Sequence, residues 1–175
     1  MIHNDLYRPS EYRGPPSQAI DDAWDKLWMI GGVPLRIDDQ DLGRLHLTTH
    51  KNWSRISDEM GGGFRGYPIV FHQLHCLNTL RKASYREHYQ NDKLFKDPPN
   101  VSRAHQDHCI EMIRQQLMCS AEMVPTLTFE SGGHTLPDFN AVQVCRNFDE
   151  LKAWTEAHVI HGGGNWDLPP NIAEA

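Results

Sequence analysis

The chain has 175 residues, of which 39% are hydrophobic and 23% are charged, a composition typical of one soluble globular domain. Its formal net charge is −6 and its lysines and arginines are dispersed, which argues against a protein that binds nucleic-acid phosphates. No stretch reaches the ~20 apolar residues that a membrane helix requires, and no signal segment follows Met1, so the chain as given is expected to be soluble.

The N-terminal third predicts short elements separated by irregular chain. Residues 1–16 contain three prolines and predict an extended arm. Ser17 is the predicted N-cap of an amphipathic helix that ends at Gly31-Gly32. Farther on, we expect a short helix over Asp38–Leu42 and a brief strand over Arg44–Thr49.

The middle of the chain predicts two long helices. They cover residues 69–89 and 103–123, with Ser102 as the N-cap of the second. The link between them, which includes the polar and proline-containing residues 96–100, is short. A short link favours an antiparallel helix pair.

The C-terminal part predicts only short elements. Thr126–Phe129 alternates in hydrophobicity before a glycine loop at Gly132-Gly133, Phe148–Val159 reads as a last short helix, and residues 162–175 read as an irregular tail. The predicted fold is mainly α. It is a single domain over residues 1–175, built around the antiparallel pair of long helices, with irregular loops and at most a short strand or two.

A five-residue element occurs twice, as His72-Gln-Leu-His75-Cys76 and as His105-Gln-Asp-His108-Cys109. On a helix, residues at i, i+3 and i+4 share one face, so each copy presents two imidazoles and a thiol together. If the helices pack with these faces inward, four imidazoles converge and need a shared partner, because unsatisfied polar groups are costly to bury. A metal ion would satisfy all four. The predicted metal ligands and catalytic residues are His72, His75, His105 and His108.

The identity of the metal depends on the cysteines. Imidazole suits zinc, copper, iron and nickel; a closed four-ligand site indicates structural zinc, whereas an all-histidine site with open positions indicates copper. The four cysteines allow two disulfides in three pairings, or four thiols. A Cys76–Cys109 bond would join the two helices and leave an all-histidine site, and Cys119–Cys145 would then tie the second helix to the C-terminal segment. We favour these two disulfides.

At these residues the sequence resembles the UstYa-like family of fungal biosynthetic gene clusters, whose hallmark is a pair of His-x-x-His-Cys motifs. Further matching segments are Glu11–Ser17, Asp21–Trp24 and Asp138–Trp154, so that the resemblance covers roughly residues 11–155. It implies oxidative tailoring of peptides and other secondary metabolites by cyclisation, dehydrogenation, hydroxylation or halogenation. It also implicates copper through the histidine motifs, with zinc as the alternative metal.

The resemblance also implies a location. Members usually begin with a transmembrane helix that places the domain in a secretory-pathway lumen, a compartment that suits disulfides. That helix is absent here, so we expect either a shortened form of a longer chain or a soluble member, with a membrane contact only in the first case. One departure concerns chemistry: where members often carry a histidine two residues before the cysteine that corresponds to Cys145, this chain has Gln143.

Three further side chains are candidates for contact with a substrate. Trp53 and Tyr67 flank the glycine stretch before the first motif and are predicted to line a cleft, and His134, in a glycine loop, is a third candidate. The expected substrate is a small-molecule or peptide natural product, and nucleic acid is not expected. The sequence leaves open whether two subunits, alike or different, pair to complete a site.

Three functions remain in competition. We favour a copper-dependent oxidase-type enzyme. The second is a redox-neutral cyclase, dehydratase or isomerase without a cofactor, in which the same histidines act as acid and base. The third is a non-catalytic, zinc-stabilised binding module, in which metal binding and folding would be coupled.

Overall fold

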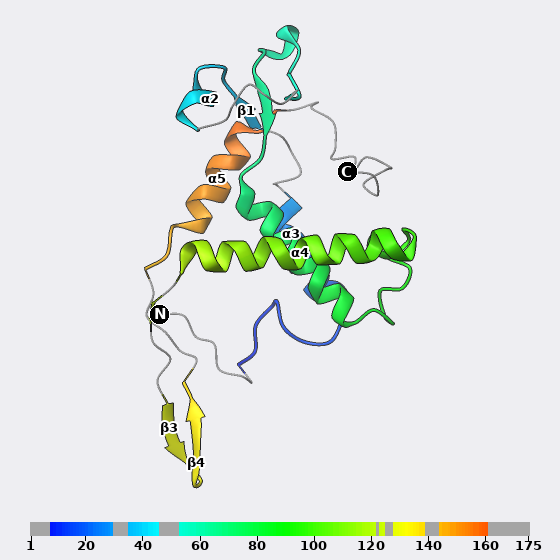
Figure 1. Ribbon diagram of the computed structural model, residues 1–175, viewed down its shortest axis with the longest axis vertical. Coiled ribbons are helices and arrows are strands. Elements are labelled where there is room, and N and C mark those ends of the chain that lie inside the picture. Colours follow the sequence, from blue (N-terminus) through cyan, green and yellow to red (C-terminus); the bar gives the residue numbers. More distant parts are fainter. Residues whose placement is uncertain are drawn as a thin grey trace.

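The computed structural model describes residues 8–29, 35–45, 53–121, 123–124, 128–138 and 144–160. It is mainly α-helical, as predicted, with two small two-stranded sheets (Figure 1). The helices are α1 (Gln18–Trp28), α2 (Asp41–Arg44), α3 (Ile69–Ser84), α4 (Pro99–Ser120) and α5 (Phe148–His158), with single 3-10 turns at Asp58–Met60 and Lys93–Phe95. The strands are β1 (Leu35–Ile37), β2 (Phe64–Gly66), β3 (Thr128–Ser131) and β4 (His134–Pro137).

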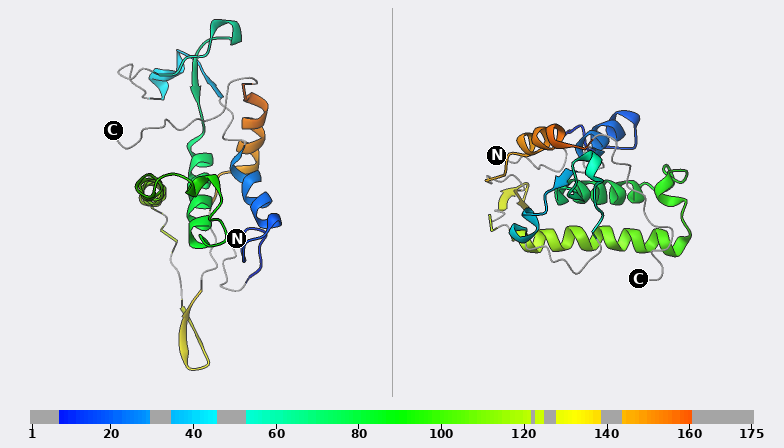
Figure 2. Two further views of the ribbon diagram at one scale, coloured as in Figure 1. Left: turned by 90° about the vertical axis from the view of Figure 1, so that its right-hand side faces the viewer. Right: turned by 90° about the horizontal axis from the view of Figure 1, so that it is seen from above.

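Helix α3 is the central element. It packs against α4 on one side and against α1 on the other, so that α3 lies in the middle of three layers (Figure 2). Helices α3 and α4 run in opposite directions and cross obliquely, which confirms the predicted antiparallel pair (Figure 1). Helix α5 lies on the same side of α3 as α1, and Phe148 at its start contacts Phe71 with ring centroids 5.9 Å apart.

The most deeply buried side chains are mostly small. Phe71 and Ile56 are the large apolar ones among them, at 1% and 2% exposure. Thr79 and Thr155 are equally buried, and each hydroxyl donates to a carbonyl oxygen one turn earlier, at 3.1 and 2.8 Å. These bonds satisfy the hydroxyls, so their burial carries little polar cost. None of the described helices is long and apolar enough to cross a bilayer.

The helix boundaries differ from the predicted ones where tertiary contacts decide them. Ser17 caps α1 as predicted, its Oγ accepting from the Ile20 backbone N–H at 3.3 Å. Helix α3 ends at Ser84 rather than at residue 89. The chain turns there because Tyr89 folds back to bond Asp21 and Lys82 pairs with Asp92, at 2.7 Å in both cases.

Helix α4 begins earlier than predicted and does not use Ser102 as its N-cap. Pro98 occupies the cap and Pro99 the first turn, where a residue without an N–H loses no hydrogen bond. The short helix predicted over Asp38–Leu42 is Asp41–Arg44 instead. The predicted strand over Arg44–Thr49 is therefore wrong at Arg44, and residues 46–49 lie outside the described residues.

Four strands form where at most two were expected. The pair β3 and β4 is a hairpin around Gly132-Gly133, whose φ angles of 58° and 79° are those of a type I′ turn, the two-residue turn that suits glycine. The pair β1 and β2 joins segments on either side of the residues that the structure leaves undescribed between 46 and 52, with Ile37 opposite Phe64. Three-residue strands of this kind carry too little pattern to be predicted from sequence.

Replacement with alanine should lower the stability of the protein at Ser17 but not at Ser102. Ser17→Ala removes a working cap and should lower the free energy of unfolding by ~1 kcal/mol. Ser102 is 3% exposed and its hydroxyl has no partner among the described residues, so Ser102→Ala should leave stability unchanged or raise it. Urea unfolding of both variants measures this; a loss at Ser102 as large as that at Ser17 would contradict the observed helix start.

Candidate metal centre at the helix crossing

The two motifs meet where α3 crosses α4. His72 and His75 project from α3 and His105 and His108 from α4, because each pair is spaced one helical turn apart. The Nε2 atoms of His72 and His108 lie 3.3 Å apart. The rings of His75 and His105 are 6.2 Å apart between centroids, and those of His72 and His75 are 6.1 Å apart. The structure thus brings all four predicted ligands into one cluster.

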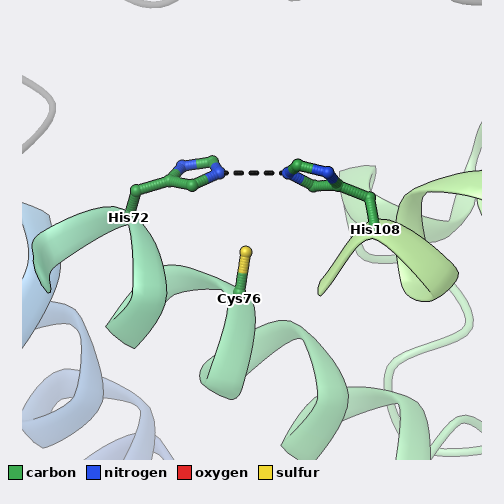
Figure 3. Close-up of side chains that lie close together, drawn as sticks. All are labelled: His72, Cys76 and His108. Carbon is green, nitrogen blue, oxygen red and sulfur yellow. Dashed lines mark hydrogen bonds between the residues drawn. The ribbon is translucent and has the colours of Figure 1, made fainter. Parts of the chain in front are cut away.

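Within this cluster, three ligand atoms form a compact group. The donor atoms of His72, Cys76 and His108 all lie within 4.8 Å of one another, and the thiol points between the two rings (Figure 3). In a tetrahedral site with metal–nitrogen bonds of about 2.0–2.1 Å, two ligand nitrogens lie about 3.3 Å apart, which matches the Nε2 separation of His72 and His108. The donor set therefore fits a metal ion. His108 is exposed, so an ion could enter from that side.

The other two histidines form a more enclosed pair. Burial lowers the pKa of His75 to about 4, with the nearby His72 and His105 adding to the shift, and burial likewise lowers the pKa of His105. The edge of Trp28 on α1 closes over His75, with 4.5 Å between ring centroids. At neutral pH His75 and His105 are therefore uncharged and can accept a proton or bind a metal.

Cys76 and Cys109 are both fully buried, at 0% exposure, and their thiols are hydrogen-bonded to each other. Donation from Cys109 and from His72 lowers the pKa of Cys76, whereas the bond to Cys76 and burial raise the pKa of Cys109. The same contact with Cys76 raises the pKa of His72. The Cys76 sulfur is thus the more readily ionised of the two.

No disulfide is formed in the structure by the four cysteines, all of which are described. Cys119 and Cys145 are exposed thiols. The contact between Cys76 and Cys109 places the sulfurs of the first predicted pair side by side. Both predicted disulfides remain predictions.

The three predicted substrate residues lie outside α3 and α4, the helices that carry the motif histidines. Trp53 and Tyr67 are half-buried, before β2 and between β2 and α3. His134 is exposed and begins β4 at the tip of the hairpin, which stands away from the crossing of α3 and α4 (Figure 1). The structure does not bring His134 to the motif histidines. A substrate role for these three residues stays a prediction, and Gln143 lies outside the described residues.

Sequence reasoning missed two contributors to the site. Trp28 has the helical spacing of a core residue, yet its ring lies beside that of His75. Gln73, the second residue of the first motif, donates to Gln116 Oε1 at 3.0 Å and ties α3 to α4 beside the histidines. The only signal for Gln73 was its repetition as Gln106, and Gln106 instead bonds the backbone carbonyl of Ser102 at 3.2 Å.

Comparison with known proteins connects nearly all of the described region to one family. The family model for "Mycotoxin biosynthesis protein UstYa" matches residues 2–158. Two relatives from Diaporthe leptostromiformis, the UstYa family oxidases phomYc and phomYc′, are 36% and 34% identical over 91% and 98% of this chain. The transacylase cctO of Talaromyces islandicus is 32% identical over 94% of it. The chain spans 63%, 59% and 57% of the lengths of these three relatives. No solved structure matches it.

Proposed function

Because this chain belongs to the UstYa family of mycotoxin biosynthesis proteins, we propose that it is a metal-dependent, oxidase-type tailoring enzyme of fungal secondary-metabolite biosynthesis. The metal is copper, bound in the cluster of His72, His75, His105 and His108. The substrate is a peptide or small-molecule natural product, modified by oxidative cyclisation, dehydrogenation, hydroxylation or halogenation. The setting is the lumen of the secretory pathway.

The observation that carries this proposal is the 3.3 Å separation of the His72 and His108 Nε2 atoms within a cluster of four imidazoles. Two imidazoles at this distance fit neighbouring positions on one metal ion. Imidazole is a ligand that suits copper, and the oxidase names of two relatives favour a redox-active metal over zinc.

The residues of the site have different roles because of their positions. Copper, when bound, supplies one-electron redox chemistry with dioxygen as the electron acceptor. His72 and His108 hold the ion on the open side, where a substrate can approach. His75 and His105 are kept neutral by burial and stand ready as ligands or as acceptors of the proton that the substrate loses. Trp28 covers His75 and limits the access of water to it.

Metal removal and restoration test the proposal. The purified chain should contain copper by elemental analysis. Stripping it with a chelator should lower oxygen-dependent turnover of the natural-product precursor by at least ~10²-fold, because the redox centre is lost. Copper should restore turnover and zinc should not. Full turnover in the stripped protein would rule out the metal oxidase, and unfolding on chelation in a protein without turnover would indicate the zinc-stabilised module.

A redox-neutral enzyme is the second candidate. Its supporting observation is the His75–His105 pair, which burial keeps in the unprotonated form that can accept a proton at neutral pH. The transacylase name of one relative also shows that not every relative is named an oxidase. In this case His75 would take a proton from the substrate, and His72, whose pKa is raised by its contact with Cys76, would return one. Chelation would not change turnover.

A further inference from the structure

Cys76 is in contact with two different partners. On one side its sulfur belongs to the group of donor atoms formed with His72 and His108. On the other side it is hydrogen-bonded to the thiol of Cys109. A sulfur can serve as a metal-binding thiolate or as half of a disulfide, but not as both, so these two contacts exclude each other chemically.

We propose that in the reduced protein Cys76 is a third metal ligand beside His72 and His108, and that a Cys76–Cys109 disulfide withdraws it and leaves an all-histidine site. The proposal rests on the metal-binding part of the proposed function and concerns the regulation of that site. It assigns the two cysteines of the repeat different roles.

The geometry supports the difference between the two cysteines. Cys76 projects between the rings of His72 and His108 (Figure 3). Within the described residues, the group of atoms that could hold an ion includes Cys76 but not Cys109. Cys109 instead contacts Cys76 and Thr79 in the core between α3 and α4, where it is 0% exposed. Cys109 is thus placed to compete with a metal ion for the Cys76 sulfur.

The two states should prefer different ions. A site of two imidazoles and one thiolate suits thiophilic ions such as zinc and copper(I), whereas imidazoles alone suit copper(II) among others. Disulfide formation removes one hydrogen from each thiol, and an oxidant takes both protons and both electrons. With a diazenedicarboxamide (diamide) as oxidant, the N=N bond accepts them and becomes N–N with two N–H groups, while the S–S bond forms.

Cobalt(II) is a suitable probe, since a cobalt–thiolate bond gives a charge-transfer absorption that a cobalt–imidazole bond does not. The reduced protein should show this absorption. Diamide treatment should abolish it together with the thiols of Cys76 and Cys109, which alkylation and peptide mass mapping locate separately from those of Cys119 and Cys145. Cys109→Ser keeps Cys76 but cannot form the bond, so its absorption should survive diamide. Cys76→Ser should lack the absorption in every condition and bind cobalt at least ~10-fold more weakly.

Cys119→Ser is the matched control, because Cys119 lies on the same helix as Cys109 and is exposed. It should behave as the parent protein does. Circular dichroism establishes that each variant is folded, and Cys109→Ser decides the question even if Cys76→Ser does not fold.

Three negative results are distinguishable. Histidine-dependent cobalt binding without thiolate absorption in the reduced protein would overturn this inference and leave the proposed function standing. Loss of absorption on diamide treatment in Cys109→Ser would overturn the switch. Failure of the reduced parent protein to bind cobalt or copper at all would contradict the proposed metal enzyme itself.

Discussion

Replacing His72 and His108 together with alanine should lower the affinity for copper by at least ~10³-fold, about 4 kcal/mol of binding free energy. The reason is geometric: these two Nε2 atoms lie 3.3 Å apart, a separation that suits two ligands of one ion, and the double variant leaves only Cys76 of the compact donor group. Isothermal titration of the metal-free protein with copper measures the loss, and oxygen-dependent turnover should fall with it.

The variant should fail in binding rather than in folding. His72 is half-buried and His108 is exposed, so without metal their removal should change the free energy of unfolding by no more than ~1 kcal/mol. His158→Ala is the control, because this histidine is exposed on α5, where it stacks on Trp154. Copper affinity within threefold of the parent value in the double variant would show that His72 and His108 are not ligands.

Arg81→Ala should destabilise the protein by ~3–5 kcal/mol, because it leaves a largely buried carboxylate without its partner. Arg81 is the centre of a polar cluster that ties α1 to α3 and to the loop after α3. It contacts Asp21 at 2.5 Å, Asn78 at 2.8 Å and the Tyr89 hydroxyl at 3.1 Å. Tyr89 completes the cluster by donating to Asp21 at 2.7 Å. The side chains of Arg81 and Asp21 are only 11% and 21% exposed.

Urea unfolding measures this effect against Arg103→Ala. Arg103 pairs with Asp107 along α4, but both side chains are more than half exposed, so Arg103→Ala should unfold at nearly the same urea concentration as the parent protein. Arg81→Ala should also loosen α1 and with it Trp28, the wall of the site, so that the intrinsic tryptophan fluorescence should change even below the unfolding transition. Equal losses for the two arginines would show that the cluster is no more than a surface pair.

Predictions from the sequence are most reliable for features that depend on a single helix. The spacing of His72, His75 and Cys76 fixes a shared helix face regardless of what packs against it, and the Ser17 cap needs only its own helix. Both predictions hold. The end of α3 does not follow from local sequence, because residues 85–89 are compatible with helix and are turned back by Asp21, which lies 68 residues away from Tyr89.

The start of α4 illustrates a different limit. Ser102 has the residue type of a cap, but Pro98 and Pro99 already provide a helix start, and the earlier start carries Ser102 into the buried face against α3. Residue preferences for the N-cap position are evaluated one position at a time. They do not include the tertiary packing that each of two possible helix starts would produce.

The sequence by itself determined the mainly α fold, the antiparallel pair of long helices and the two histidine faces, since these depend on periodicity and on the length of a link. It could not determine that the two copies of the repeat are unequal. The tertiary structure adds that the donor atoms of His72, Cys76 and His108 form one compact group, whereas Cys109 contacts Cys76 but is not part of that group. The physical reason is the oblique crossing of α3 and α4 (Figure 1). Two helices that cross obliquely present different turns of each motif to solvent and to the core. The crossing angle is not encoded in the repeat itself.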